Sequence, residues 1–281
     1  MNGLETVVDS IERLASEGVK AERGDYIGED GLLFCGKCDT RKQGRYEMPW
    51  GIVTPPCICE CEKERREMAE LESKQNMLKE FYRDDCFGRD KFKKMREWTF
   101  DIDDGANEKI SNVSRNYVDN FGRMKSDGKG LLLFGEVGTG KTFYAACIAN
   151  AVIDMCIPAM VTNFASIRDD LQESFEGRKQ YIERLINFPL LILDDLSAES
   201  KSEYMNEIVF NIIDGRYRSG LPLIVTTNLT ADEMKNTADV KNKRIFSRLF
   251  EMCIPLEVVG NDRRRERLKE AHAEYKALLG Y

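Results

Sequence analysis

The chain has 281 residues, of which 42% are hydrophobic, 9% aromatic and 32% charged, and its formal net charge is −7. This length allows one large domain or two smaller ones, and the apolar content excludes a wholly disordered chain. The excess of acids excludes a globally basic nucleic-acid binder, although a local basic patch is compatible with it. Apolar runs stay far below the roughly 18 residues of a membrane span, and the first residues lack a signal-peptide pattern. We therefore expect a cytoplasmic protein without membrane contact.

The composition changes twice along the chain and predicts three regions: 1–61, 62–84 and 85–281. The first begins with a short amphipathic helix around residues 8–14. In the second, residues 62–82 contain no Gly or Pro and are rich in Glu, Lys and Arg, which predicts a connecting helix with a solvated charged face. The third region is large enough to hold a catalytic domain.

Five of the nine cysteines lie in the first region. Two residues separate Cys35 from Cys38, and 18 residues later the sequence continues with Cys57, Cys59 and Cys61. The first pair can face one ion from a tight turn, and two of the three later thiolates would complete a tetrahedral zinc site in a small N-terminal zinc-binding domain. Which of the three later cysteines bind is open. Iron–sulfur ligation, a redox pair and reduced structural cysteines are the alternatives.

From about residue 85, short apolar runs alternate with longer amphipathic segments. The predicted strands are Leu131–Phe134, Ala159–Thr162, Leu190–Leu193, Leu223–Thr227 and Cys253–Leu256. The predicted helices lie around residues 110–121, 142–155, 167–175, 181–186 and 208–213. Continuous apolar strands separated by helices predict an α/β fold, with a parallel sheet that is covered on both faces.

The sequence GEVGTGKT, from Gly135 to Thr142, matches the pattern G-x-x-x-x-G-K-[ST] between a predicted strand and a predicted helix. Its glycines allow backbone N–H groups to surround a phosphate at a helix N-terminus. We expect Lys141 to reach the β- and γ-phosphates of ATP and the Thr142 hydroxyl to bind Mg²⁺. The predicted nucleotide-binding residues here are Gly135, Glu136, Val137, Gly138, Thr139, Gly140, Lys141, Thr142 and Phe143.

Polar residues follow two further predicted strands. Asp194 and Asp195 come directly after the strand that ends at Leu193, and Asn228 follows the next strand. We expect Asp194 to bind Mg²⁺, Asp195 to orient or polarise the attacking water, and the Asn228 amide to hold that water. The alternatives are two acids that cap the next helix and an asparagine in an ordinary turn.

These residues resemble AAA+ ATPases of the DnaC/DnaI-type helicase-loader and IstB-like branch. The resemblance covers roughly residues 85–270 and rests on GEVGTGKT, LLILDDL, IVTTN and RIFSRLFE. It implies a five-stranded parallel sheet in the order 5-1-4-3-2, with strands numbered along the chain. It also implies that no large helical lid follows Gly260, and that Asn228 is the sensor-1 residue.

The same resemblance implies two functional arginines near the end of the domain. One arginine reaches into the ATP site of a neighbouring subunit; Arg248 is the best match, and Arg244 is the alternative. In the stretch from Gly260 to Arg264, Arg264 would be the sensor-2-like residue, although Asp262 stands where the family usually has Ser.

The function implied is an ATP-dependent loader of a hexameric, DnaB-type replicative helicase onto single-stranded DNA. Such a protein forms homo-oligomers with shared ATP sites, and its zinc-bearing N-terminal module contacts the helicase. Asp195, where many AAA+ proteins have Glu, suggests slow, switch-like hydrolysis. Basic patches at Lys241–Arg248 and Arg263–Arg267 are candidate DNA contacts. The alternatives are an IstB-like ATPase that assists a transposase, a P-loop kinase, and a nucleotide-gated adaptor without turnover.

Overall fold

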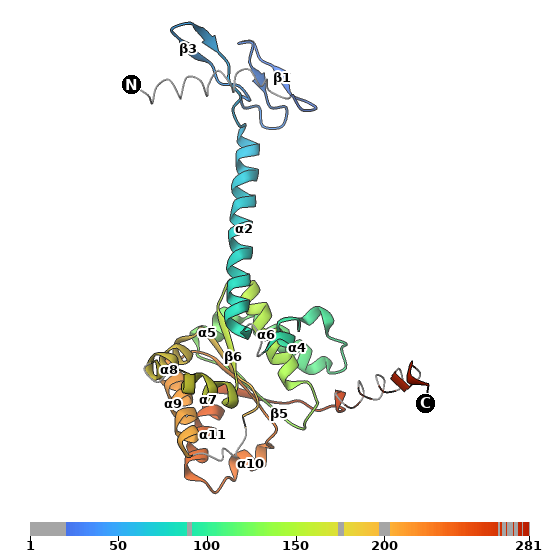
Figure 1. Ribbon diagram of the computed structural model, residues 1–281, viewed down its shortest axis with the longest axis vertical. Helices are drawn as coiled ribbons and strands as arrows, with labels where there is room; N and C mark the ends of the chain where they lie inside the picture. Colours follow the sequence, from blue (N-terminus) through green and yellow to red (C-terminus); the bar gives the residue numbers. More distant parts are fainter. Residues whose placement is uncertain are drawn as a thin grey trace. The chain divides into compact units, whose positions relative to one another are not determined.

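The computed structural model describes residues 21–88, 92–173, 177–196, 203–263, 265, 268, 272, 275, 276 and 278–280. The chain divides into two compact units, Met1–Asn76 and Met77–Tyr281 (Figure 1). The helix predicted around residues 8–14 lies outside the described residues.

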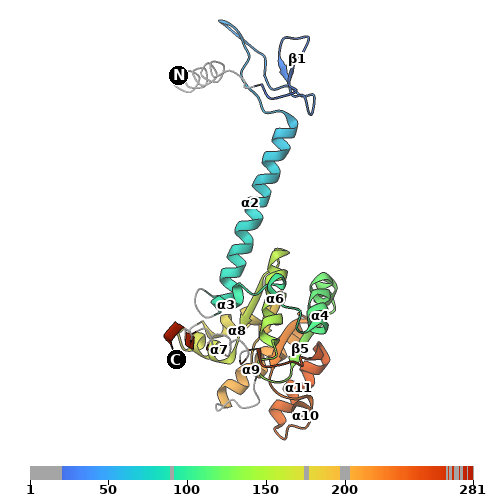
Figure 2. The ribbon, with the colours of Figure 1, turned by 90° about the vertical axis from the view of Figure 1, so that its right-hand side faces the viewer.

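The described part of the first unit contains two small antiparallel hairpins (Figure 1), and Figure 2 shows the one with β1 from a second side. Strand β1 (Tyr26–Ile27) pairs with β2 (Leu33–Phe34), and β3 (Tyr46–Met48) pairs with β4 (Gly51–Val53). Two-stranded hairpins are marginally stable alone. The buried residues around them are Leu32, Leu33, Cys35, Pro55 and Cys59. Because so small an apolar core stabilises little, a unit of this kind usually needs a metal or another cross-link.

Helix α2 (Glu60–Phe87) contains the stretch that the sequence predicts as a connecting helix. Most of its side chains are exposed, including Met68 and Leu71, which agrees with the predicted solvated face. Its last two residues, Cys86 and Phe87, are buried and belong to the hydrophobic core of the second unit. The boundary between the two units falls inside this helix.

The second unit is built on a five-stranded sheet in which every neighbouring pair of strands is parallel. Its strands are β5 (Gly130–Phe134), β6 (Ala159–Thr162), β7 (Leu190–Leu193), β8 (Leu223–Thr227) and β9 (Cys253–Glu257). Their order is β6-β7-β8-β5-β9, which is the order 5-1-4-3-2 counted from the other edge. The predicted α/β fold with a five-stranded parallel sheet is therefore confirmed.

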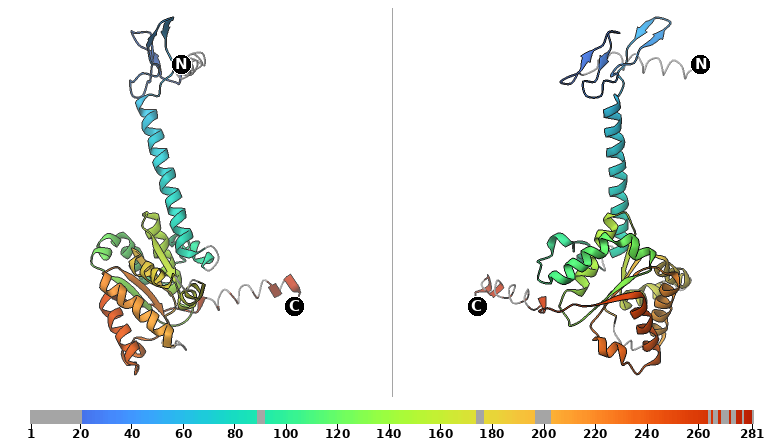
Figure 3. Two further views of the ribbon diagram at one scale, coloured as in Figure 1. Left: turned by 60° about the vertical axis from the view of Figure 1, so that its left-hand side comes forward. Right: turned by 180° about the vertical axis from the view of Figure 1, so that it is seen from behind.

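Helices cover both faces of this sheet (Figure 3). The described helices are α3 (Lys93–Arg96), η1 (Phe100–Ile102), α4 (Glu108–Asp119), α5 (Phe121–Ser126), α6 (Lys141–Asp154), α7 (Phe164–Glu173), α8 (Arg178–Asn187), α9 (Glu203–Ser219), α10 (Ala231–Lys235) and α11 (Val240–Met252). Alternate residues of one strand enter different cores: Leu131 and Leu133 pack with α4 and α6, whereas Leu132 packs with α7, α9 and α11. This alternation explains why the central strands are mostly apolar.

One predicted helix is divided in the structure. The sequence predicts a single helix around residues 110–121, but α4 ends at Asp119 and α5 begins at Phe121. Asn120 between them has φ −101° and ψ 16°, outside the helical region. The apolar spacing continues across the break, so periodicity alone did not reveal it.

Among the described helices, none is both long and apolar enough to cross a membrane. Strands β7, β8 and β5 are neighbours, so the loops at their carboxyl ends meet at one edge of the sheet. This edge is where open parallel sheets ordinarily bind their ligands.

Candidate functional site

The loop from Gly135 to Thr142 joins β5 to α6, as predicted. Gly135, Gly138 and Gly140 have φ of +134°, +84° and +102°, which residues with a side chain rarely adopt. A Cβ atom on Gly135 would lie 2.7 Å from the carbonyl oxygen of Val258. The glycines therefore let the backbone curl at the N-terminus of α6, where N–H groups and the helix dipole favour an anion.

The two polar residues that end this loop are held by different parts of the site. Lys141 is buried, and its Nζ donates hydrogen bonds to the carbonyl oxygens of Gly135 (2.9 Å) and Glu136 (2.6 Å). The Thr142 hydroxyl donates to Oδ1 of Asp194 over 2.8 Å. A hydroxyl and a carboxylate oxygen at this distance fit the hard oxygen donors that Mg²⁺ prefers.

The residues after β7 and β8 form one hydrogen-bonded group. Asp194 is buried, whereas the adjacent Asp195 is exposed. The Asn228 amide donates to Oδ1 of Asp195 over 3.0 Å. Thr226, the residue before the last of β8, lies between the two acids: its hydroxyl is 2.7 Å from Oδ1 of Asp194 and 2.8 Å from the backbone nitrogen of Asp195. The sheet thus brings the three predicted polar residues together.

A cavity of about 220 Å³ lies at this edge of the sheet. Its lining residues are Trp98, Val137, Gly138, Gly140, Lys141, Thr142, Phe143, Asp194, Asp195, Thr226, Asn228 and Arg263. Most of the predicted nucleotide-site residues are in this set. Thr139 lies beside it, with its buried hydroxyl donating to the carbonyl of Glu136 over 2.9 Å.

Three lining residues were not predicted for the nucleotide site, although Arg263 belongs to the stretch predicted as a candidate DNA contact. Trp98 precedes the sheet and lies 6.0 Å from Phe143 between ring centroids, and no motif spacing marked it. Thr226 could have been noticed as a polar residue that ends an apolar strand. Arg263 lies beside the predicted Arg264, which is outside the described residues. The backbone N–H of Arg263 donates to the Gly138 carbonyl over 3.1 Å, and its guanidinium pairs with Asp104.

The structure does not bring Arg248 into this cavity. Arg248 lines a separate pocket of about 400 Å³ on α11, together with Lys243, Arg244 and others. Its guanidinium pairs with Asp214 at 2.5 Å and lies 4.8 Å from the ring centre of Phe210. Arg244 is exposed in the same pocket, with no ion pair to any residue that the structure describes.

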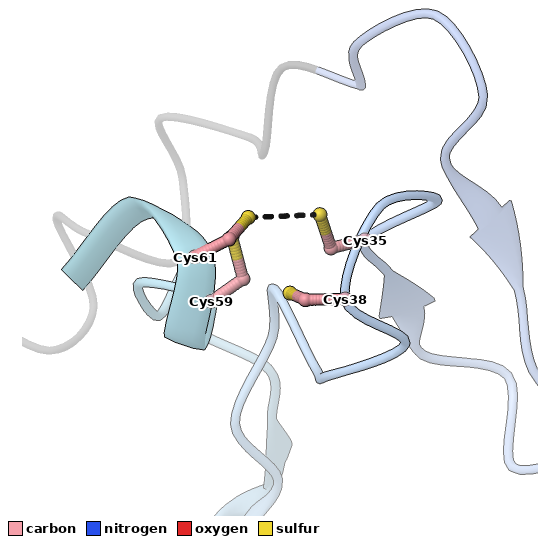
Figure 4. Close-up of side chains that lie close together, drawn as sticks. All are labelled: Cys35, Cys38, Cys59 and Cys61. Carbon is pink, nitrogen blue, oxygen red and sulfur yellow. Dashed lines mark hydrogen bonds between the residues drawn. The ribbon is translucent and has the colours of Figure 1, made fainter. Parts of the chain in front are cut away.

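A second candidate site is formed by four of the five clustered cysteines (Figure 4). The sulfur atoms of Cys35, Cys38, Cys59 and Cys61 all lie within 4.8 Å of one another. Cys61 Sγ is 3.6 Å from Cys35 Sγ and 3.6 Å from Cys59 Sγ. Tetrahedral zinc with bonds of about 2.3 Å places its sulfurs about 3.8 Å apart, so the four thiols fit zinc. Cys57 is exposed and outside the cluster.

Neighbouring groups shift the thiol pKa values in opposite directions. A hydrogen bond with the Thr40 hydroxyl lowers the pKa of Cys38 to about 6, and backbone N–H groups lower that of Cys35. Hydrogen bonds with the other cysteines raise the pKa of Cys61 to about 12. Four sulfurs this close repel one another when ionised, and a bound cation would remove that penalty.

The fold and the site define the class of protein: a P-loop nucleotide-binding unit of the AAA+ type. The family model described as "IstB-like ATP binding protein" matches residues 62–271, well over half of the chain. The chain belongs to this family. The predicted resemblance and the predicted AAA+ ATPase domain are thereby confirmed.

Two curated relatives are both named replicative helicase loaders. DnaI of Bacillus subtilis (strain 168) is 30% identical over 151 residues, which cover 49% of this chain and 48% of DnaI. DnaC of Escherichia coli (strain K12) is 29% identical over 126 residues, which cover 43% of this chain and 50% of DnaC. The chain thus spans about half the length of the curated relatives it matches.

Solved structures of the same two kinds of protein share the fold. A crystal structure of the DnaC helicase loader matches with a TM-score of 0.52 at 25% identity, covering 59% of this chain and 99% of that chain. A crystal structure of DnaI matches with a TM-score of 0.51 at 24% identity, covering 61% and 93%.

Proposed function

We propose that the chain loads a hexameric replicative DNA helicase onto single-stranded DNA, with ATP binding and slow hydrolysis as its switch. The observation that carries this proposal is the similarity to DnaI and DnaC, which are replicative helicase loaders. The same relatives favour a helicase over a transposase as the partner.

The nucleotide site supports the ATP-dependent part of the proposal. Backbone N–H groups of the Gly135–Thr142 loop would bind the phosphates, and Lys141 would neutralise their charge. Thr142 and Asp194 would hold Mg²⁺, which when bound screens the charge on the phosphate oxygens. Asp195 and Asn228, hydrogen-bonded to each other, would hold and polarise the attacking water. The short Asp195 side chain favours slow turnover.

The arginine that completes a neighbouring subunit's site is part of the same proposal. We favour Arg244 over Arg248 because Arg248 is already paired with Asp214, whereas Arg244 is exposed on the same helix. In mixed oligomers, Lys141→Ala subunits should restore hydrolysis to Arg244→Ala subunits, since one type supplies the loop and the other the arginine. A P-loop kinase, which closes a lid over its own substrate, should show no such rescue.

The same exposed face of α11 is the candidate DNA contact that the described residues support. Lys241 and Lys243 are exposed there, beside Arg244. Lysines and arginines that contact phosphates release counterions, so binding of single-stranded DNA should weaken steeply with salt and should be strongest with ATP. Binding that is insensitive to salt would contradict this part of the proposal.

We propose that the domains are residues 1–61, a connecting segment 62–84 and an ATPase domain 85–281. Cys35, Cys38, Cys59 and Cys61 would hold zinc, which when bound cross-links a unit with little apolar core. The domain 1–61 would contact the helicase. Its exposed apolar side chains, Tyr46, Trp50 and Ile52 on and between β3 and β4, support a role in binding another protein.

The experiment that tests the proposal is co-purification with a replicative helicase, with ATP, with ADP and without nucleotide. We expect the intact chain to retain the helicase, and a chain that lacks residues 1–80 to lose it. Lys141→Ala is the matched control, because it disables the ATP site and leaves the first unit unchanged. Capture of a transposase in place of the helicase, or retention without residues 1–80, would contradict the proposal.

A further inference from the structure

Thr226 is a buried polar residue that contacts the two acids after β7. It is 1% exposed, and β8 lies beside β7, with Val225 paired to Leu193. This register places Thr226 next to the first residues beyond β7. Its hydroxyl oxygen is within hydrogen-bond distance of the Asp194 carboxylate (2.7 Å) and of the Asp195 backbone nitrogen (2.8 Å).

The direction of these two hydrogen bonds follows from the number of hydrogens that each group can donate. A threonine hydroxyl has one hydrogen and two lone pairs. The N–H of Asp195 can only donate, so the hydroxyl oxygen accepts there and its single hydrogen points to Asp194. Oδ1 of Asp194 then accepts from the hydroxyls of both Thr226 and Thr142, the latter at 2.8 Å. Two hydroxyl donors on one oxygen fix the orientation of the Asp194 carboxylate.

The backbone of Thr226 makes a second hydrogen bond to the turn that contains Asp195. Its carbonyl accepts a hydrogen bond from the N–H of Leu196 over 2.8 Å. Between these anchors, Asp195 has φ +57°, a conformation that non-glycine residues seldom adopt. Such a conformation persists only where neighbouring contacts over-determine it, and Thr226 supplies two of them.

We propose that Thr226 is a positioning residue for the nucleotide site: it holds the Asp194 carboxylate toward the Mg²⁺ position and holds Asp195 in the conformation that faces Asn228. The inference rests on the proposed ATP and Mg²⁺ site and is independent of helicase loading. Thr226 contacts Asp194 through its hydroxyl and leaves phosphate binding to the glycine loop. Its removal should therefore weaken Mg²⁺ binding far more than metal-free nucleotide binding.

Three substitutions in the full-length chain test this role. Thr226→Val keeps the shape but removes the hydroxyl, and Thr226→Ser keeps the hydroxyl. Thr227→Val is the matched control, because Thr227 is the next residue of the same strand and donates to the Leu196 carbonyl (2.6 Å) instead of an acid. Apparent ATP affinity is measured by calorimetry over a Mg²⁺ series and in EDTA. Backbone hydrogen exchange at Asp195 is measured in metal-free protein.

For Thr226→Val, we expect the Mg²⁺ concentration for half-maximal effect to rise about ten- to a hundredfold, as for loss of a hydrogen bond to a charged group. Affinity in EDTA should stay within about threefold of the unsubstituted chain, and exchange at Asp195 should accelerate because its N–H loses its acceptor. Thr226→Ser and Thr227→Val should keep the original Mg²⁺ dependence. An unchanged Mg²⁺ dependence in Thr226→Val, or an equal loss in Thr226→Ser, overturns the inference.

The two proposals fail in different ways. If the unsubstituted chain binds no ATP in any condition, the nucleotide site is refuted and this inference with it. If ATP and Mg²⁺ behave as expected but no helicase co-purifies, only helicase loading is refuted.

Discussion

The cysteine cluster allows a specific prediction about metal binding. Of the three later cysteines, Cys59 and Cys61 belong to the four-sulfur cluster and Cys57 does not. Two of the sulfur–sulfur distances are 3.6 Å, and all four sulfurs lie within 4.8 Å of one another, which brackets the distance of about 3.8 Å between sulfurs that bind zinc through bonds of about 2.3 Å. Structural zinc contributes about 10–16 kcal/mol in small domains. Shared equally, that is about 2.5–4 kcal/mol for each ligand, or a hundred- to a thousandfold in zinc affinity. We expect Cys59→Ser to lose this much and Cys57→Ser to lose almost none.

The assay is competition with a zinc chelator of known affinity, read together with the zinc content of the purified chain. Cys57→Ser is the control: Cys57 Sγ donates to the Arg41 carbonyl at 3.3 Å, outside the four-sulfur cluster. Chelation should also expose the first unit to proteolysis, since little apolar surface holds it together. Equal losses in the two variants, or visible absorption from bound iron–sulfur, would refute the reasoning.

Three further outcomes are expected. Asn228→Ala should keep ATP affinity within about threefold but lower turnover about tenfold or more, because only the attacking water loses a partner. Lys141→Ala should instead weaken ATP binding itself. Nucleotide titration together with a phosphate-release assay distinguishes the two variants. Arg216→Met should lower the free energy of unfolding by about 2–4 kcal/mol, because the fully buried guanidinium donates to three backbone carbonyls that would lose their partner. The exposed Arg218→Met on the same helix should cost under about 0.5 kcal/mol in urea unfolding, and equal losses would contradict this account. Raising salt from 50 to 200 mM should weaken single-stranded DNA binding about tenfold or more, as measured by fluorescence anisotropy.

The fold could be predicted because its central strands are apolar on both faces. The ends of each predicted strand lie within one residue of the ends of an observed strand. Strands β5 to β8 lie between two helical layers and have no solvent face that would interrupt the apolar run. The break at Asn120 escaped prediction because the residues on both sides keep the spacing of one continuous helix. The hairpins of the first unit escaped as well, since β1 and β2 have two residues each and show no alternation.

The nucleotide site could be predicted where residues adjacent in sequence make it up. The glycine loop and the two acids after β7 are such stretches, and parallel strands bring them to one edge of the sheet. Trp98 and Arg263 reach the cavity from separate parts of the chain, and no nucleotide-binding motif includes them. Thr226 carried a local signal, because it is a polar residue near the end of an apolar strand, but its contact with the acids after β7 depends on the pairing of two strands. For Arg248, the ion pair with Asp214 depends on how α11 packs against α9, which the spacing along α11 does not contain.

The choice among the three later cysteines has a local cause that spacing does not reveal. Helix α2 begins at Glu60, and the carbonyl of Cys59 accepts hydrogen bonds from the N–H groups of Glu62 (3.1 Å) and Lys63 (2.9 Å). Cys59 therefore caps the start of a long helix, and Cys61 lies in the first turn of that helix. Cys57 precedes that turn, and its backbone N–H is bound to the Lys42 carbonyl (2.8 Å). The helix start, which acids at Glu60 and Glu62 favour, thus selects the two cysteines that complete the cluster.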